Sequence, residues 1–202
     1  MAIRASLAAR TKRALLIVPR GGLLIVSGPP LGGKGPLAAA LEESLPNCLK
    51  LEAVDNLSVA GQSYRPRTQS GKTLTEVEPA ILRDAVRCLQ TPNAVPPLVL
   101  VCARFPTAAL RRQAAEVAVA ASAKFLLVEA ISSPIRSLRR VSRLILPPDE
   151  MARRFAAYES ARRAYEALTG RERASLPAVT FKSVLSDLGG TVQRVVAAWH
   201  SR

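Results

Sequence analysis

Five residues close together in the chain have the types and spacing to bind a phosphate group: Gly28, Gly32, Gly33, Lys34 and Gly35. Glycines let backbone N–H groups approach a phosphate because no Cβ stands in the way, and a lysine after them can reach its outer oxygens. The position after such a lysine usually carries Ser or Thr, whose hydroxyl helps to hold Mg²⁺, but here it is Gly35. The stretch predicts an anion-binding loop without that metal ligand.

The elements on both sides of this loop support the interpretation. Residues 23–26 are an apolar run with β-branched members, which is typical of a strand buried on both faces. Residues 37–43 are compatible with a helix, and a helix N-terminus adds partial positive charge where the phosphate would lie. A plain turn rich in glycine and proline is the alternative interpretation.

Charge and composition restrict the classes of function. The chain has 202 residues and a formal net charge of +14, which indicates an anionic partner such as a nucleotide, a nucleic acid, an acidic protein or an anionic membrane. An arginine-rich composition without such a partner is the alternative. His200 is the only histidine, and Cys48, Cys88 and Cys102 have no CxxC spacing, so a zinc site and histidine-based catalysis are disfavoured. The cysteines fit small buried residues in a reducing compartment.

The first 20 residues form a basic segment with five Lys or Arg and no acid. They lack the features of a secretory signal, so we expect a basic surface arm, or an organelle transit peptide in a eukaryote. Residues 21–202 are predicted to form one domain. No apolar run reaches the length of a membrane-spanning helix, and we expect a cytoplasmic protein, with an organelle matrix as the alternative. A membrane-surface function is disfavoured because residues 1–14 lack large aromatic anchors.

Strand and helix patterns alternate along the rest of the chain. This order predicts an α/β fold, a three-layer α/β/α sandwich with a mainly parallel five-stranded sheet and right-handed crossovers. Further strands are expected at 49–54, 98–102, 125–128 and 178–181, and helices at 36–45, 76–90, 107–121, 134–144, 149–168 and 191–199.

Two further segments carry residue types that could belong to a site. Asp55 follows the second predicted strand, at the end of the sheet where ligands bind in open α/β folds, although it also suits a turn or a helix cap. Gly71-Lys72-Thr73 has the residue types that end a phosphate-binding loop. We reject that interpretation because Pro66 replaces the first glycine and no apolar strand precedes it.

Taken together, these segments resemble the P-loop NTPases, in particular small-molecule kinases of the zeta-toxin and gluconate-kinase type. Ser27-Gly-Pro-Pro-Leu-Gly-Gly-Lys-Gly35 resembles the Walker A loop of that group. Asp55 matches the acid that faces the acceptor substrate, residues 99–105 resemble the third strand, and residues 125–130 and 133–143 resemble the fourth strand and an arginine-bearing lid helix. Lys34, Asp55, Arg140 and Arg143 are therefore the candidate catalytic residues, and the glycines at 28, 32, 33 and 35 are candidate nucleotide-binding residues.

The chain departs from the family pattern at both metal positions. Gly35 replaces the Walker A Ser or Thr, and Cys102 replaces the aspartate that organises Mg²⁺ in the family. The resemblance thus implies ATP as the ligand, with weakened Mg²⁺-dependent phosphoryl transfer. The alternative is a catalytically decayed fold that acts as a structural or nucleic-acid-binding subunit, in which the lid arginines form a solvated basic face.

Overall fold

The computed structural model describes residues 21–53, 77–91, 97–133, 135, 137, 139, 147–183 and 188–201. Five strands form one sheet in the order β2-β3-β1-β4-β5, and every neighbouring pair is parallel. The strands are β1 (Gly22–Ser27), β2 (Cys48–Glu52), β3 (Leu98–Cys102), β4 (Lys124–Ile131) and β5 (Ala178–Lys182). The predicted α/β class and its parallel five-stranded sheet are confirmed.

Strand β1 lies at the centre of the sheet. It pairs with β3 on one side and β4 on the other, and all six of its residues are buried. A parallel strand covered by helices on both faces needs apolar side chains in both directions, and Leu23, Leu24, Ile25 and Val26 supply them. The loop that follows β1 therefore emerges from the most buried part of the sheet.

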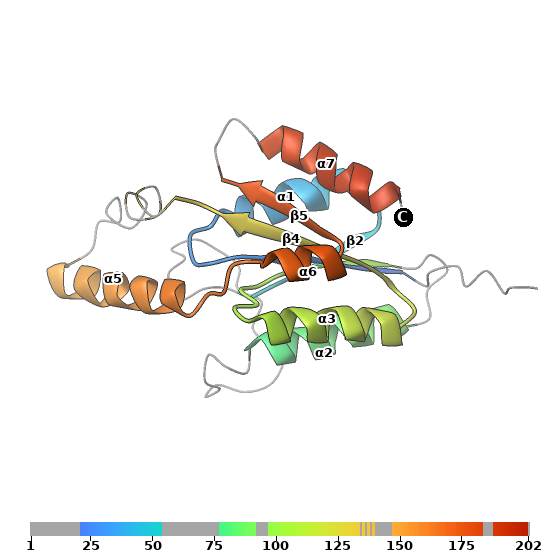
Figure 1. The fold of residues 1–202 in the computed structure, drawn as a ribbon, viewed down its shortest axis with the longest axis horizontal. Helices are drawn as coiled ribbons and strands as arrows, with labels where there is room; N and C mark the ends of the chain where they lie inside the picture. Colours follow the sequence, from blue (N-terminus) through green and yellow to red (C-terminus); the bar gives the residue numbers. More distant parts are fainter. Residues whose placement is uncertain are drawn as a thin grey trace, which may run out of the picture.

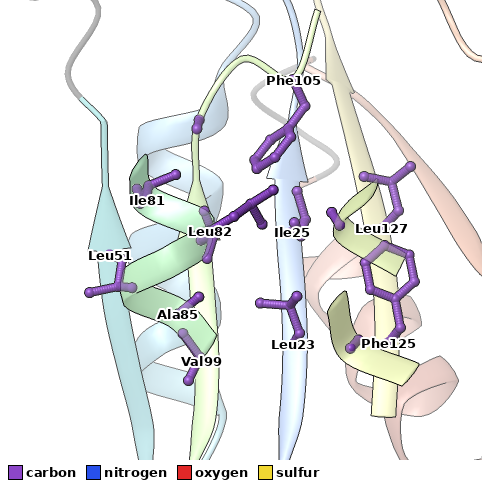
Figure 2. Close-up of a cluster of buried hydrophobic side chains, with 14 of the residues drawn as sticks. Leu23, Ile25, Leu51, Ile81, Leu82, Ala85, Val99, Phe105, Phe125 and Leu127 are labelled. Atoms are coloured by element: carbon purple, nitrogen blue, oxygen red, sulfur yellow. The ribbon is translucent and has the colours of Figure 1, made fainter. Parts of the chain in front are cut away.

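Helices cover both faces of the sheet, as Figure 1 shows. Helices α1 (Lys34–Ser44) and α7 (Leu188–His200) lie on one face. Helices α2 (Val77–Gln90), α3 (Ala108–Ala120) and α6 (Gly170–Ser175) lie on the opposite side, and α5 (Pro148–Arg163) extends away from the layers. In Figure 2, Ile81, Leu82 and Ala85 of α2 pack against the side chains of β1 and β3. The three-layer arrangement thus has a separate apolar core on each side of the sheet.

One helix predicted from the sequence is wrong in its extent. The expected helix over residues 149–168 ends at Arg163, and the short helix α6 begins at Gly170. A capping box starts α6: the Thr169 hydroxyl accepts a hydrogen bond from the Glu172 N–H, and the Glu172 carboxylate accepts one from the Thr169 N–H. The spacing Thr169-x-x-Glu172 was visible in the sequence and could have indicated this second helix.

Strand β4 is also longer than predicted, because it continues past Glu129 to Ile131. Several predictions concern residues outside the described ranges: the basic segment 1–20, the polar segment 58–75 and most of the predicted helix 134–144. Among the helices that the structure describes, none has both the length and the apolar character needed to cross a membrane.

Candidate functional site

The loop between β1 and α1 wraps tightly at the carboxyl end of the central strand. The backbone has positive φ angles at Gly28 (154°), Leu31 (58°) and Gly33 (96°), which produce the successive turns of the loop. The N–H of Gly32 donates to the Pro29 carbonyl at 3.1 Å and closes the first turn. The predicted glycine-rich loop is therefore curled and lies directly before a helix.

Packing against neighbouring strands explains why three positions of this loop are glycine. A Cβ at Gly28 would lie 2.0 Å from the carbonyl oxygen of Ala130, and a Cβ at Gly32 would lie 2.5 Å from the same atom. A Cβ at Gly33 would lie 2.7 Å from the Ser183 hydroxyl, which follows β5. These positions thus need glycine not only for its backbone conformation, but also because the ends of β4 and β5 leave no room for a side chain.

Lys34 folds back over the loop that precedes it. Its side chain is 6% exposed, and Nζ donates hydrogen bonds to the carbonyls of Gly28 at 3.0 Å and Pro29 at 2.9 Å. These contacts hold the ammonium group against the loop backbone rather than in solvent. A buried ammonium group beside backbone N–H groups is an arrangement that attracts an anion.

The first turn of α1 adds to this positive potential. The helix begins at Lys34, has Gly33 as its N-cap with no side-chain cap, and carries no acidic residue in its first turn. The first N–H groups of an α-helix have no partner inside the helix, and the helix dipole places partial positive charge there. No carboxylate of this turn compensates that charge, so the helix end favours an external anion.

The segment that follows β3 anchors the start of the loop through one carbonyl group. The Arg104 carbonyl accepts hydrogen bonds from the Ser27 hydroxyl at 2.8 Å and from the Gly28 N–H at 3.3 Å. The Arg104 side chain in turn lies 3.6 Å from the buried carboxylate of Glu78 on α2. The start of the loop is therefore fixed to the segment after β3, which is itself held to α2.

A carboxylate and a thiol meet beside the start of α1. Glu52 ends β2, Cys102 ends β3, and their side chains approach to 3.9 Å between Oε1 and Sγ. A Cβ at Gly35 would lie 3.6 Å from the same Glu52 oxygen, which is an ordinary van der Waals distance. Glu52 thus faces positions 35 and 102, the two at which the sequence resemblance implies a departure from the family pattern, and sequence reasoning did not single it out.

A buried ionic network supports the opposite side of the loop. Glu129 in β4, 1% exposed, accepts hydrogen bonds from the Leu168 N–H at 2.8 Å and from Arg173 at 2.9 Å. The Tyr165 hydroxyl donates to Glu129 at 3.3 Å and also interacts with the Ser27 hydroxyl. Burial, with the charge of Glu129, raises the pKa of Tyr165 to about 12. Tyr165 therefore stays protonated and connects the α5–α6 segment to the last residue of β1.

The structure describes only some of the predicted site residues. It brings together Gly28, Gly32, Gly33, Lys34 and Gly35 in the curled loop. Asp55, Arg140 and Arg143 lie outside the described residues, so their proposed roles stay predictions. Within the described ranges, no group of three or more His, Cys, Asp or Glu side chains gathers as a metal centre.

Comparison with solved structures identifies the fold class. The Chaetomium thermophilum protein Kti12 in complex with ADP-AlF3 has a TM-score of 0.62 at 15% identity, over 87% of this chain and 98% of that chain. The Mycobacterium tuberculosis APS kinase CysC in complex with AMPPNP and APS has a TM-score of 0.61 at 20% identity, over 90% of this chain and 99% of that chain. A Sinorhizobium meliloti gluconokinase has a TM-score of 0.52 at 17% identity, over 89% and 95%.

These similarities show that the chain has the fold of the P-loop kinases. The glycine-rich loop stands where that fold places its phosphate-binding loop, between the first strand and the first helix. No family model matches the chain, and no curated protein matches its sequence. The comparisons therefore establish the fold of the chain, which the sequence resemblance predicted.

Proposed function

We propose that this chain binds a nucleoside triphosphate, ATP in the first instance, at the loop from Gly28 to Gly35. The observation that carries the proposal is the conformation of Lys34, whose ammonium group is buried against the carbonyls of Gly28 and Pro29 at the start of α1, a helix whose first turn carries no acidic residue. The similarity to Kti12 with ADP-AlF3 and to APS kinase with AMPPNP supports the choice of a nucleotide as the ligand.

In this proposal the chain's own residues bind and orient the phosphates. Lys34 exchanges its hydrogen bonds with the carbonyls of Gly28 and Pro29 for contacts with the outer phosphate oxygens. The N–H groups of the loop and of the first turn of α1 surround those oxygens and neutralise part of their charge. Arg140 and Arg143 would clamp the terminal phosphate, and Asp55 would face a hydroxyl-bearing acceptor, as the family resemblance implies.

Phosphoryl transfer in this fold class uses a divalent cation that neutralises charge developing between the β- and γ-phosphates. Gly35 offers no hydroxyl to such a cation, and Cys102 offers a thiol in place of a carboxylate. We therefore propose a kinase-like protein whose Mg²⁺-dependent transfer is slow compared with its ability to bind a nucleotide.

Titration of the full chain with a fluorescent ATP analogue in EDTA tests nucleotide binding separately from metal. We expect binding in the micromolar to millimolar range, and a loss of about tenfold or more in Lys34→Ala, because a charge-assisted phosphate contact contributes about 1.5–3 kcal/mol. Arg112→Ala is the matched control, since it removes one positive charge from an exposed position on α3. Equal affinities of these two variants, or no binding at millimolar nucleotide, would refute the proposal.

The net charge of +14 supports a second candidate, a basic structural or nucleic-acid-binding subunit of a larger complex. Binding to RNA or DNA through phosphates releases counterions, so the affinity would fall steeply with salt. Measuring the affinity for single-stranded RNA between 50 and 200 mM salt distinguishes this candidate, with a loss of about 10³-fold or more if six or more phosphates are contacted. Weak binding that does not change with salt would exclude it.

A further inference from the structure

The tip of the phosphate loop is a tight turn with a bulky residue where glycine is the usual choice. The Gly32 N–H donates to the Pro29 carbonyl at 3.1 Å, so Pro30 and Leu31 are the two central residues of a β-turn. Leu31 has a φ of 58°, in the left-handed region, whereas the ring of Pro30 fixes its own φ near about −65°. A positive φ at the second central residue alone defines a type II turn, which prefers glycine there.

The left-handed conformation of Leu31 decides where one N–H group of the loop points. In the more common type I turn the same residue has a φ of about −90°, and the peptide between the two central residues is turned over. Relaxation of Leu31 to that conformation would reverse its N–H, which is one of the loop N–H groups in the proposed phosphate site. A non-glycine residue persists in the left-handed region only where its surroundings hold it there.

A hydroxyl group from the segment that follows β4 holds Leu31. Ser132 Oγ donates to the Leu31 carbonyl at 3.2 Å, and the two residues are 101 positions apart in the chain. The start of this segment is itself fixed to the sheet, because the Ser183 N–H, after β5, donates to the Ile131 carbonyl at 2.7 Å. Ser132 therefore reaches the turn from a rigid support.

A second hydroxyl group orients the first. The Ser132 and Ser137 hydroxyls are hydrogen-bonded to each other, and Ser137 is 2% exposed. A serine hydroxyl has a single proton to donate, so when Ser132 gives its proton to Leu31, Ser137 must be the donor to Ser132. The Ser137 N–H donates to the Ser133 carbonyl at 3.1 Å, which fixes Ser137 at the start of the predicted helix 134–144.

We propose that Ser132, oriented by Ser137, is a positioning residue for phosphate binding, because its hydrogen bond keeps Leu31 in the left-handed conformation. This inference rests on the proposed nucleotide binding. Neither hydroxyl contacts the phosphates; together they keep the loop in its binding conformation before the ligand arrives, which avoids the loss of affinity that a partly populated conformation brings. The same two hydroxyl groups link the tip of the loop to the helix that resembles an arginine-bearing lid.

The affinity of the full chain for a fluorescent ATP analogue in EDTA tests this role. We expect Ser132→Ala to weaken binding about three- to tenfold, the effect of one hydrogen bond. Ser137→Ala should weaken it less, and the double variant should bind no more weakly than Ser132→Ala, because Ser137 acts through Ser132. Ser44→Ala is the matched control, since it removes an exposed hydroxyl that donates to the Ala40 carbonyl within α1, and it should bind as the unsubstituted chain does.

Glycine at position 31 separates this role from a general structural one. Glycine adopts a positive φ without support, so in a Leu31→Gly background Ser132→Ala should weaken binding by less than about twofold. An equal loss in both backgrounds would overturn the inference. Equal affinities of the unsubstituted chain and Ser132→Ala would overturn it as well, while leaving the proposed nucleotide binding intact.

An NMR measurement without ligand observes the turn directly. In a type II turn the ψ of the first central residue, about 120°, brings its Hα close to the next N–H, so a strong cross-peak should join Pro30 Hα and the Leu31 N–H. This cross-peak should weaken in Ser132→Ala and persist in Ser44→Ala, and an unchanged cross-peak would contradict the inference. If the unsubstituted chain binds no analogue at millimolar concentration, the proposed nucleotide binding fails, and the cross-peak still decides whether Ser132 holds the turn.

Discussion

The Arg111 guanidinium on α3 donates to both carboxylate oxygens of Glu172 on α6, at 2.9 and 3.2 Å. Arg111 is fully buried, and its remaining donor atom binds the carbonyls of Phe105 and Glu166. The two helices are 61 residues apart between these positions, so the pair joins distant segments on one face of the sheet. It fixes the α5–α6 connection that also holds Tyr165 beside Ser27 under the phosphate loop.

Replacing Arg111 by Met should destabilise the protein by about 3–5 kcal/mol, because the Glu172 carboxylate would remain buried without its partner. Urea denaturation followed by circular dichroism measures this change. Arg112→Ala, exposed on the same helix, should change the free energy of unfolding by less than about 0.5 kcal/mol. The pair Arg111→Met with Glu172→Met should recover part of the loss, and an equal or greater loss in the double variant would contradict this account.

The same pair predicts a loss of stability in acid. Burial alone would raise the pKa of Glu172, but hydrogen bonds from Arg111 and Thr169 outweigh it and lower the pKa. A carboxyl group with a lowered pKa in the folded state contributes stability above its unfolded pKa, and this contribution is lost as the pH falls through the folded value. Denaturation midpoints should therefore fall from about pH 5 downward. In Glu172→Gln that fall should be smaller, and an unchanged pH profile would refute the assignment.

Gly28 should tolerate no side chain. Gly28→Ala places a Cβ 2.0 Å from the Ala130 carbonyl oxygen in a backbone conformation with φ of 154°, so the loop must move. We expect a loss of about 1–3 kcal/mol from this strain and weaker nucleotide binding. Gly189→Ala is the control, because no atom lies within 4 Å of a Cβ built at that position in α7. It should stabilise the helix by about 0.5 kcal/mol, as measured by thermal denaturation.

Gly35 differs from Gly28 because its neighbourhood has room. Gly35→Ser meets Glu52 at an ordinary contact distance of 3.6 Å and needs no positive φ, so the folded structure should be kept. The added hydroxyl restores the ligand that Mg²⁺ has in P-loops. We expect Mg²⁺ to strengthen binding of the ATP analogue several-fold more in Gly35→Ser than in the unsubstituted chain, whereas Gly35→Ala should show no gain. Equal Mg²⁺ effects in Ser and Ala variants would contradict a metal position beside residue 35.

The sequence predicted the sheet more accurately than the site, for a physical reason. The apolar run Leu98–Cys102 matches β3, because a strand buried on both faces must be continuously apolar. The break between α5 and α6 was missed because the helical periodicity of Tyr158, Tyr165 and Leu168 continues across it. Glycines and Lys34 indicated the loop through local spacing. Glu52, in contrast, meets Cys102 and Gly35 only once β2 and β3 pair, so spacing along the chain could not reveal it.

Trp199, the single tryptophan of the chain, lies at the other end of the central strand from the loop. A Cβ at Gly22 would lie 2.1 Å from its indole ring, and Lys124 Nζ lies 5.0 Å from the ring centroid. Because β1 rises about 3.3 Å per residue, its five steps from Gly22 to Ser27 separate the indole from the loop by about 17 Å. Intrinsic fluorescence therefore monitors the docking of the last helix, and a ligand bound at the loop can alter this emission only through the elements that lie between them, β1 and the helix α1 that packs on α7.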